Sequence, residues 1–137
     1  ALTSALTETD GVIICPSNPF VSVDPILALP GMRDALRGTG VPIVAVSPIV
    51  GGAAIKGPTA KMMTELSVPV TTEQVARHYA DLVTGFLIDT QDADREDAVR
   101  ALGLATVVAQ SVMITLQDRV DLARTVVDFI RGLRKAG

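Results

Sequence analysis

Residues 38–48 read Gly-Thr-Gly-Val-Pro-Ile-Val-Ala-Val-Ser-Pro, and this stretch decides the fold. Turn-forming residues bound an uninterrupted apolar run at positions 42–46. Such a run is typical of a strand that is buried on both faces of a parallel sheet. Similar runs recur at residues 12–15, 85–89 and 105–109. The chain is therefore predicted to fold around a parallel sheet of four strands.

Segments with helical spacing separate and follow these runs, which is the pattern of βαβ units. They cover residues 30–36, 58–66, 71–82, 94–102 and 115–135. The last helix is the best defined, because Thr115 and Asp118 have capping-box spacing. Its apolar stripe, expected to face the sheet, consists of Val120, Ala123, Val126, Val127 and Ile130. Residues 1–137 are predicted to form one α/β unit without an internal linker.

The composition excludes several classes of protein. Of the 137 residues, 48% are hydrophobic, which is too many for a disordered chain, and no apolar run reaches the roughly 18–20 residues of a membrane span. A net charge of −3 and an aromatic content of 3% argue against nucleic acid as a partner. The single cysteine fits a reducing cytoplasm. Because the chain starts at Ala1 without a methionine, and four strands are few for a parallel sheet, we expect a piece of a longer chain.

The loop after the first predicted strand is a candidate binding loop. Ligands of open α/β sheets bind beyond the carboxyl ends of the strands, and this loop reads Cys-Pro-Ser-Asn-Pro-Phe-Val-Ser at residues 15–22. Two prolines restrict the backbone around Ser17 and Asn18, which offer a hydroxyl, an amide and backbone N–H groups to a phosphate or nucleobase. The alternative is a tight turn in which Asn18 bonds its own backbone before Pro19.

The loop after the second strand is a second candidate. Gly51 and Gly52 would let backbone amides approach a ligand, Lys56 supplies a positive charge, and a predicted helix begins at Pro58. This combination suits an anion, in particular a diphosphate, although the spacing matches neither a Walker A loop nor a GxGxxG fingerprint. The alternative is a flexible surface loop with a solvated lysine.

No pair of residues forms a convincing nucleophile–base or acid–base constellation. Asp89, Asp92 and Asp94 follow the third strand and could collect a hard cation, but we expect them to cap the next helix and stay solvated. No metal site is predicted within this chain, because it has no cluster of histidines and cysteines. In an enzyme, this stretch would supply binding and electrostatic stabilisation.

Three motifs resemble the 2-phospho-L-lactate transferase family of coenzyme F-420 biosynthesis. The first is Ile-Cys-Pro-Ser-Asn-Pro at residues 14–19, followed by residues 21–33. The second combines Val-Ser-Pro-Ile-Val-Gly-Gly at 46–52 with Lys-Gly-Pro at 56–58 and Lys-Met-Met at 61–63. The third joins Val-Ala-Arg-His-Tyr at 75–79 to Gly-Phe-Leu-Ile-Asp at 85–89. The resemblance runs in order through nearly the whole chain.

The resemblance implies a three-layer Rossmann-like fold with helices on both faces of the sheet, of which residues 1–137 form the C-terminal part. It also implies a homodimeric, magnesium-dependent transferase that moves a 2-phospholactyl or phosphoenolpyruvyl group from a guanosine-diphosphate-linked donor to the deazaflavin precursor Fo, releasing GMP. The expected binding residues are Ser17, Asn18, Pro19, Ser22, Ser47, Gly51, Gly52 and Lys56.

The family's metal ligands and catalytic residues are expected in an N-terminal part outside this sequence, so this stretch alone should be inactive. Residues 109–113 read Ala-Gln-Ser-Val-Met where relatives often have Thr-Asp-Thr-Leu-Met, which puts any role of that aspartate in doubt at Gln110. Two alternatives stay open. One is a non-catalytic protein that binds nucleotides or nucleotide-sugars, and the other is a scaffold and dimer surface.

Overall fold

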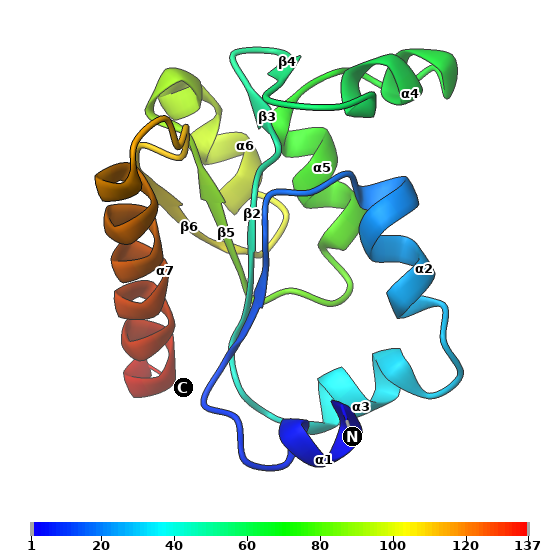
Figure 1. The fold of residues 1–137 in the computed structure, drawn as a ribbon, viewed down its shortest axis with the longest axis vertical. Helices are drawn as coiled ribbons and strands as arrows, with labels where there is room; N and C mark the ends of the chain where they lie inside the picture. The colour runs from blue at the N-terminus through cyan, green and yellow to red at the C-terminus, as the bar shows by residue number, and fades with distance from the viewer. Residues whose placement is uncertain (1, 137) are drawn as a thin grey trace.

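A computed structural model describes residues 2–136 of the chain, which fold around a four-stranded sheet (Figure 1). The strands are β1 (Val12–Ile14), β2 (Ile43–Val46), β5 (Gly85–Ile88) and β6 (Ala105–Val108). They lie in the order β1-β2-β5-β6, and every neighbouring pair is parallel. The four strands predicted from the apolar runs are confirmed, each within one or two residues of its predicted bounds.

Helices and short turns precede, connect and follow the strands. They are α1 (Leu2–Leu6), the π-helical turn η1 (Pro19–Val23), α2 (Asp24–Leu27), α3 (Met32–Gly38), α4 (Thr59–Glu65), α5 (Thr72–Tyr79), the 3-10 turn η2 (Thr90–Arg95), α6 (Glu96–Arg100) and α7 (Leu116–Ala136). Among residues 2–136, no helix is both long and apolar enough to cross a bilayer.

Both faces of the sheet are covered, which confirms the predicted three-layer α/β fold. Successive side chains of a strand point to opposite faces. Ile43 and Ala45 of β2 therefore pack in the core beneath α2, α3 and α5, whereas Val44 and Val46 pack against α7. Figure 1 shows α7 alone on one side of the sheet and the crossover helices on the other.

The apolar stripe predicted for the last helix is only partly right. Val126 and Ile130 are buried against the sheet, but Val120 and Val127 are 41% and 38% exposed, and Ala123 is exposed too. Leu122, which was left out of the predicted stripe, is buried instead. The helix carries apolar residues on two adjoining faces, and packing against β2 and β5 selects the one that contains Leu122.

The predicted start of this helix is confirmed in detail. The Thr115 hydroxyl accepts a hydrogen bond from the Asp118 N–H, and the Asp118 carboxylate accepts from the N–H groups of Ile114 and Thr115. These bonds satisfy backbone donors that a helix N-terminus otherwise leaves unpaired, and they lower the pKa of the Asp118 carboxyl. The cap therefore sets where α7 begins.

A two-stranded antiparallel hairpin was not predicted. Strands β3 (Ile49–Val50) and β4 (Ala53–Ala54) pair directly after β2, and Gly51 and Gly52 form the turn between them. Both glycines have positive φ angles, of 58° and 78°. A tight hairpin turn of this kind requires such angles, which glycine adopts without steric cost. The loop after the second strand is therefore ordered by backbone pairing.

Candidate functional site

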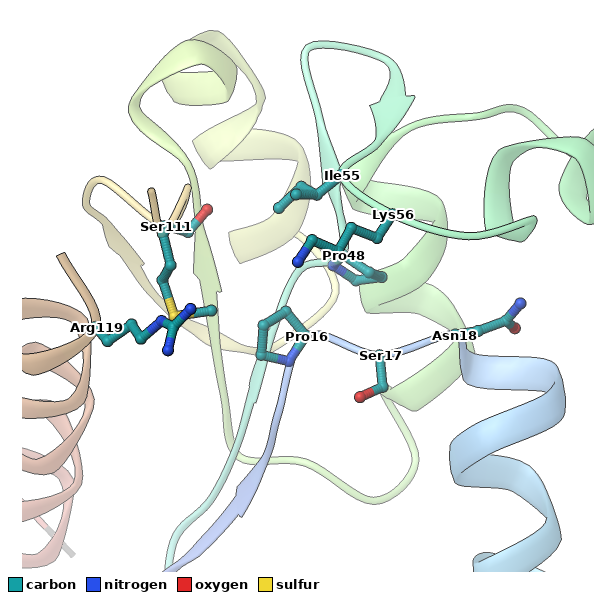
Figure 2. A pocket seen from close by; sticks show the side chains of 9 residues that line it. Pro16, Ser17, Asn18, Pro48, Ile55, Lys56, Ser111 and Arg119 are labelled. Carbon is teal, nitrogen blue, oxygen red and sulfur yellow. The ribbon is translucent and has the colours of Figure 1, made fainter. Parts of the chain in front are cut away.

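A cavity of about 310 Å³ opens at the carboxyl ends of the parallel strands (Figure 2). Its lining comes from the segments that follow β1, β2 and β6 and from the first turn of α7. The lining residues are Pro16, Ser17, Asn18, Pro48, Ile55, Lys56, Ser111, Met113 and Arg119. This confirms the expectation that the loops after the first two strands meet at one edge of the sheet, which is where open α/β sheets bind ligands.

Two positive charges reach this cavity from different walls. Lys56 follows the hairpin, whereas Arg119 belongs to α7, and Figure 2 shows both side chains directed into the space between them. Among residues 2–136, neither side chain forms a salt bridge, and the lining contains no carboxylate. The cavity is therefore locally positive in a chain whose net charge is −3, an arrangement that attracts anions.

The segment after β1 contributes backbone more than side chains. The Asn18 carboxamide oxygen accepts hydrogen bonds from the N–H groups of Phe20 (2.9 Å) and Val21 (3.3 Å), and its nitrogen lies 3.3 Å from the Met62 sulfur. In Figure 2 the Asn18 side chain points away from Lys56 and Arg119. The side chain thus makes the local turn that was the alternative prediction for this loop.

The Asn18 side chain is engaged in this turn, but two main-chain N–H groups of the segment are not. Within the part of the chain that the structure describes, the N–H groups of Ser17 and Asn18 donate no hydrogen bond. Unpaired backbone donors at a cavity wall can bind phosphate oxygens, as they do in other anion-binding turns. Ser17 and Asn18 therefore fit an anion through their backbone.

The glycine pair lies away from Lys56. Gly51 and Gly52 line a separate cavity of about 230 Å³, beside Thr71, Thr72 and η2. The Gly51 N–H donates to both oxygens of the Asp92 carboxylate, at 3.0 and 3.1 Å. The glycine amide was predicted to bind an anion, and the anion that it binds is a side chain of the protein itself.

The remaining predicted binding residues lie behind or beside the Lys56 cavity. Ser47 is fully buried: its hydroxyl donates to the Ile49 carbonyl and accepts from the Thr72 hydroxyl at 2.6 Å. Pro19 is buried at the start of η1. Ser22 lines a neighbouring apolar cavity next to β1, which Ser17 also lines. Three of the eight predicted residues, Ser17, Asn18 and Lys56, thus line the cavity that Arg119 completes.

Two of the three aspartates after β5 are not solvated as expected, since Asp89 and Asp92 are only 1% and 6% exposed, whereas Asp94 is exposed as predicted. The Asp89 carboxylate accepts hydrogen bonds from the Gln91 N–H (2.9 Å), the Ser111 N–H (2.8 Å) and the Ser111 hydroxyl (3.1 Å). Burial alone would raise the pKa of Asp89, but these donors lower it below its ordinary value. Burial raises the pKa of Asp92, whose carboxylate accepts a backbone hydrogen bond from Gly51. The expectation that Asp89 caps the following turn is confirmed.

The described residues do not fit a magnesium site of their own. Mg²⁺ is held by carboxylate and other oxygens in octahedral geometry. Within residues 2–136, no group of three or more histidine, cysteine, aspartate or glutamate side chains is arranged to hold a metal. The oxygens of Asp89 and Asp92 face N–H and O–H donors instead. Gln110 is exposed, and its side-chain nitrogen lies 3.4 Å from the Asp118 carboxylate.

Arg119 and Ser111 were not predicted as site residues. One signal could have identified Arg119, because it stands in the first turn of α7, where the helix dipole disfavours a positive charge. A cation at such a position indicates that something other than helix stability requires it. Ser111 carries no comparable signal, since its contact with Asp89 joins residues 22 positions apart in the sequence.

The fold and the site together define a Rossmann-like α/β protein with a positively charged cavity at the carboxyl ends of its strands. Residues 1–126 match the sequence model of the family described as 2-phospho-L-lactate transferase CofD. This chain therefore belongs to that family.

Individual relatives agree with this assignment. A phosphoenolpyruvate transferase of Streptomyces coelicolor is 39% identical over 133 residues, which are 96% of this chain and 42% of that protein. A 2-phospho-L-lactate transferase of Methanosarcina barkeri is 40% identical over 123 residues, 90% of this chain and 39% of that protein. That of Methanocaldococcus jannaschii is 35% identical over 129 residues, 94% of this chain and 40% of that protein. The chain thus spans about two fifths of the length of these relatives.

Proposed function

We propose that this chain is part of a transferase of coenzyme F-420 biosynthesis, and that its cavity holds the diphosphate of a guanosine-linked donor. The transferred group is 2-phospholactyl or phosphoenolpyruvyl, and the acceptor is a hydroxyl of the deazaflavin precursor Fo. The acceptor oxygen bonds to phosphorus, the phosphoanhydride bond breaks, and GMP leaves. Membership of the family supports the transferase class, and the relatives are named for both groups.

The observation that carries the proposal is the pair of cations at one cavity. Lys56 and Arg119 approach it from different elements, and a third wall contains Ser17 and Asn18, whose N–H groups donate no hydrogen bond among the described residues. A diphosphate needs charge neutralisation from several directions, and charge-assisted hydrogen bonds are stronger than neutral ones. Transfer of a substituted phosphoryl group depends mainly on positioning and charge neutralisation, so a site of this kind needs no protein nucleophile.

In this proposal, the remaining catalytic groups of the enzyme lie outside the described residues. The base that takes the acceptor's proton and the protein ligands of the magnesium ion come from outside residues 2–136, because the carboxylates of Asp89 and Asp92 face hydrogen-bond donors and the described residues hold no cluster suited to a metal. The chain is then the C-terminal part of one Rossmann-like domain in a homodimeric, cytoplasmic enzyme. The single cysteine is consistent with that compartment.

Binding of GDP to charge variants tests the diphosphate site. Lys56→Ala and Arg119→Ala should each weaken GDP binding, measured by calorimetry, by about 1–3 kcal/mol, or roughly 5- to 150-fold in Kd. Lys61→Ala and Arg124→Ala are matched controls. Lys61 is exposed on α4 and Arg124 is exposed on α7, and neither lines the cavity. Wild-type affinity in both Lys56→Ala and Arg119→Ala would place these cations in solvent and refute the site.

Release of GMP tests the transferase. The full-length protein with Mg²⁺, Fo and a guanosine-diphosphate-linked donor should release GMP, and phospholactyl and phosphoenolpyruvyl donors compared side by side identify the group. No GMP release from either donor would refute the proposal. Binding of a UDP-sugar in preference to GDP would instead favour a non-catalytic nucleotide-sugar-binding protein.

A further inference from the structure

The hairpin that precedes Lys56 is short and depends on contacts outside itself. Each of its strands has two residues, and a two-stranded ribbon of that size is marginally stable in water. Its base is held by the Ile55 N–H, which donates to the Pro48 carbonyl at 3.2 Å, and by the buried Ser47 hydroxyl. Lys56 follows immediately after Ile55. The direction in which Lys56 leaves the hairpin therefore depends on how the hairpin is anchored.

The tip of the hairpin is anchored by Asp92. Both carboxylate oxygens lie within 3.1 Å of the Gly51 nitrogen, and Asp92 is only 6% exposed, so the carboxylate is held against the turn. The turn also approaches η2 closely, because a Cβ built on Gly51 would lie 3.2 Å from the Gln91 side-chain oxygen. The N–H of Gly51 thus bonds to a carboxylate that is 41 residues further along the chain.

We propose that Asp92 is a positioning residue, which fixes hairpin β3–β4 through the Gly51 N–H and thereby directs Lys56 into the cavity. The turn that carries Asp92 follows directly on Asp89, which holds Ser111 on the cavity wall that leads to Arg119. Asp89 and the turn that follows it therefore contact both segments that lead to the positive charges. This inference rests on the proposed function in one respect, which is that it takes a diphosphate to be the group that Lys56 binds.

Two measurements on the same variants test this role. The first is the NMR order parameter of the Lys56 amide without ligand, together with the chemical shift of the Gly51 amide. The second is the Kd for GDP. The variants are Asp92→Ala, which removes the acceptor, and Asp92→Asn, which keeps one carbonyl acceptor at the same place. Asp94→Asn is the control, because it removes the same charge from an exposed side chain two positions away.

The proposal predicts that Asp92→Ala shifts the Gly51 amide resonance, lowers the order parameter of Lys56 and raises the Kd for GDP about fivefold, the factor for one lost hydrogen bond. Asp92→Asn should restore most of the order and affinity, and Asp94→Asn should match the wild type. An unchanged Lys56 order parameter in Asp92→Ala overturns the proposal, as does an unchanged Kd when the wild type binds GDP. If Lys56 becomes mobile in Asp92→Ala while the wild type itself fails to bind GDP, positioning holds and the proposed ligand is wrong.

Discussion

Asp89 stands at the carboxyl end of β5, where its carboxylate accepts hydrogen bonds from residues of two different segments. Through Gln91 it caps the turn that follows the strand, and through Ser111 it holds the loop between β6 and α7. A buried carboxylate is stable only when such donors surround it. This residue therefore joins two loops at the edge of the sheet, and its charge state should control the stability of that edge.

The stability of the protein should fall on acidification because of Asp89. The pKa of this carboxyl in the folded state is below its ordinary value of about 3.9, so its contribution is present above that value and is lost as the pH falls through the folded pKa. Asp89→Asn should lower the free energy of unfolding by about 1.5–3 kcal/mol at neutral pH. Urea unfolding of both proteins should show that the difference shrinks as the pH is lowered below about 5.

Asp97→Asn is the matched control for this prediction, because that aspartate is exposed on α6. A wild type and an Asp89→Asn variant with the same pH dependence would contradict the assigned role. Asp92 acts in the opposite direction: its pKa is raised on folding, so its contribution is present at low pH and is lost as the pH rises through the folded pKa. Asp92→Asn should therefore not reproduce the acid effect.

At the scale of elements, α7 shows what packing adds to periodicity. The predicted stripe and the observed buried face share Val126 and Ile130 but differ in Leu122 and Val127. Both faces have helical spacing, so the pattern alone could not say which one contacts the sheet. Gly85 helps to select the face of α7 that contacts the sheet, because a Cβ there would lie 2.9 Å from the Phe129 ring. The helix approaches β5 at this glycine and turns Phe129 and Ile130 toward the sheet.

Adjacent valines of α7 provide a direct test of this face. Val126 is 2% exposed and Val127 is 38% exposed. Val126→Ala should lower the free energy of unfolding by about 2 kcal/mol, because two buried methyl groups are lost and a cavity is left. Val127→Ala in the same 137-residue chain should change it by less than about 0.5 kcal/mol. Equal losses in denaturant unfolding, or a larger loss for Val127→Ala, would contradict the observed orientation.

The cap of α7 is easier to predict from sequence than the hairpin β3–β4. The spacing of Thr115 and Asp118 predicts the cap of α7, which is a local interaction between neighbours in sequence. Gly51 and Gly52 between two apolar pairs are also a hairpin signal, but strands of two residues are too short for alternation to reveal. The structure shows that the turn is held by Asp92, a contact that no local pattern contains.

For the whole molecule, the cavity combines charges that are distant in sequence. Lys56 and Arg119 are separated by two strands and three helices, and the chain as a whole is negative. The parallel order of the strands brings every carboxyl end to one edge. Local positive charge at that edge is therefore a product of topology rather than of composition.

The proposed anion binding should depend on ionic strength. Both cations are exposed, and the screening length shortens from about 10 Å at 0.1 M salt to about 3 Å at 1 M. GDP affinity should fall steadily between about 0.05 and 0.5 M NaCl when it is measured by calorimetry. The double variant Lys56→Ala/Arg119→Ala should bind weakly with a shallower salt dependence. An equal dependence in wild type and double variant would show that other charges dominate.

The sequence by itself determined the four strands, the parallel α/β class and the family resemblance, and it predicted that the loops after β1 and β2 meet at one edge of the sheet. These features depend on local composition or on runs of adjacent residues. The tertiary structure alone placed Arg119 opposite Lys56, assigned the Gly51 amide to Asp92, and buried Asp89 against Ser111. Each of these contacts joins residues at least 22 positions apart, and their distances depend on how the helices pack on the sheet.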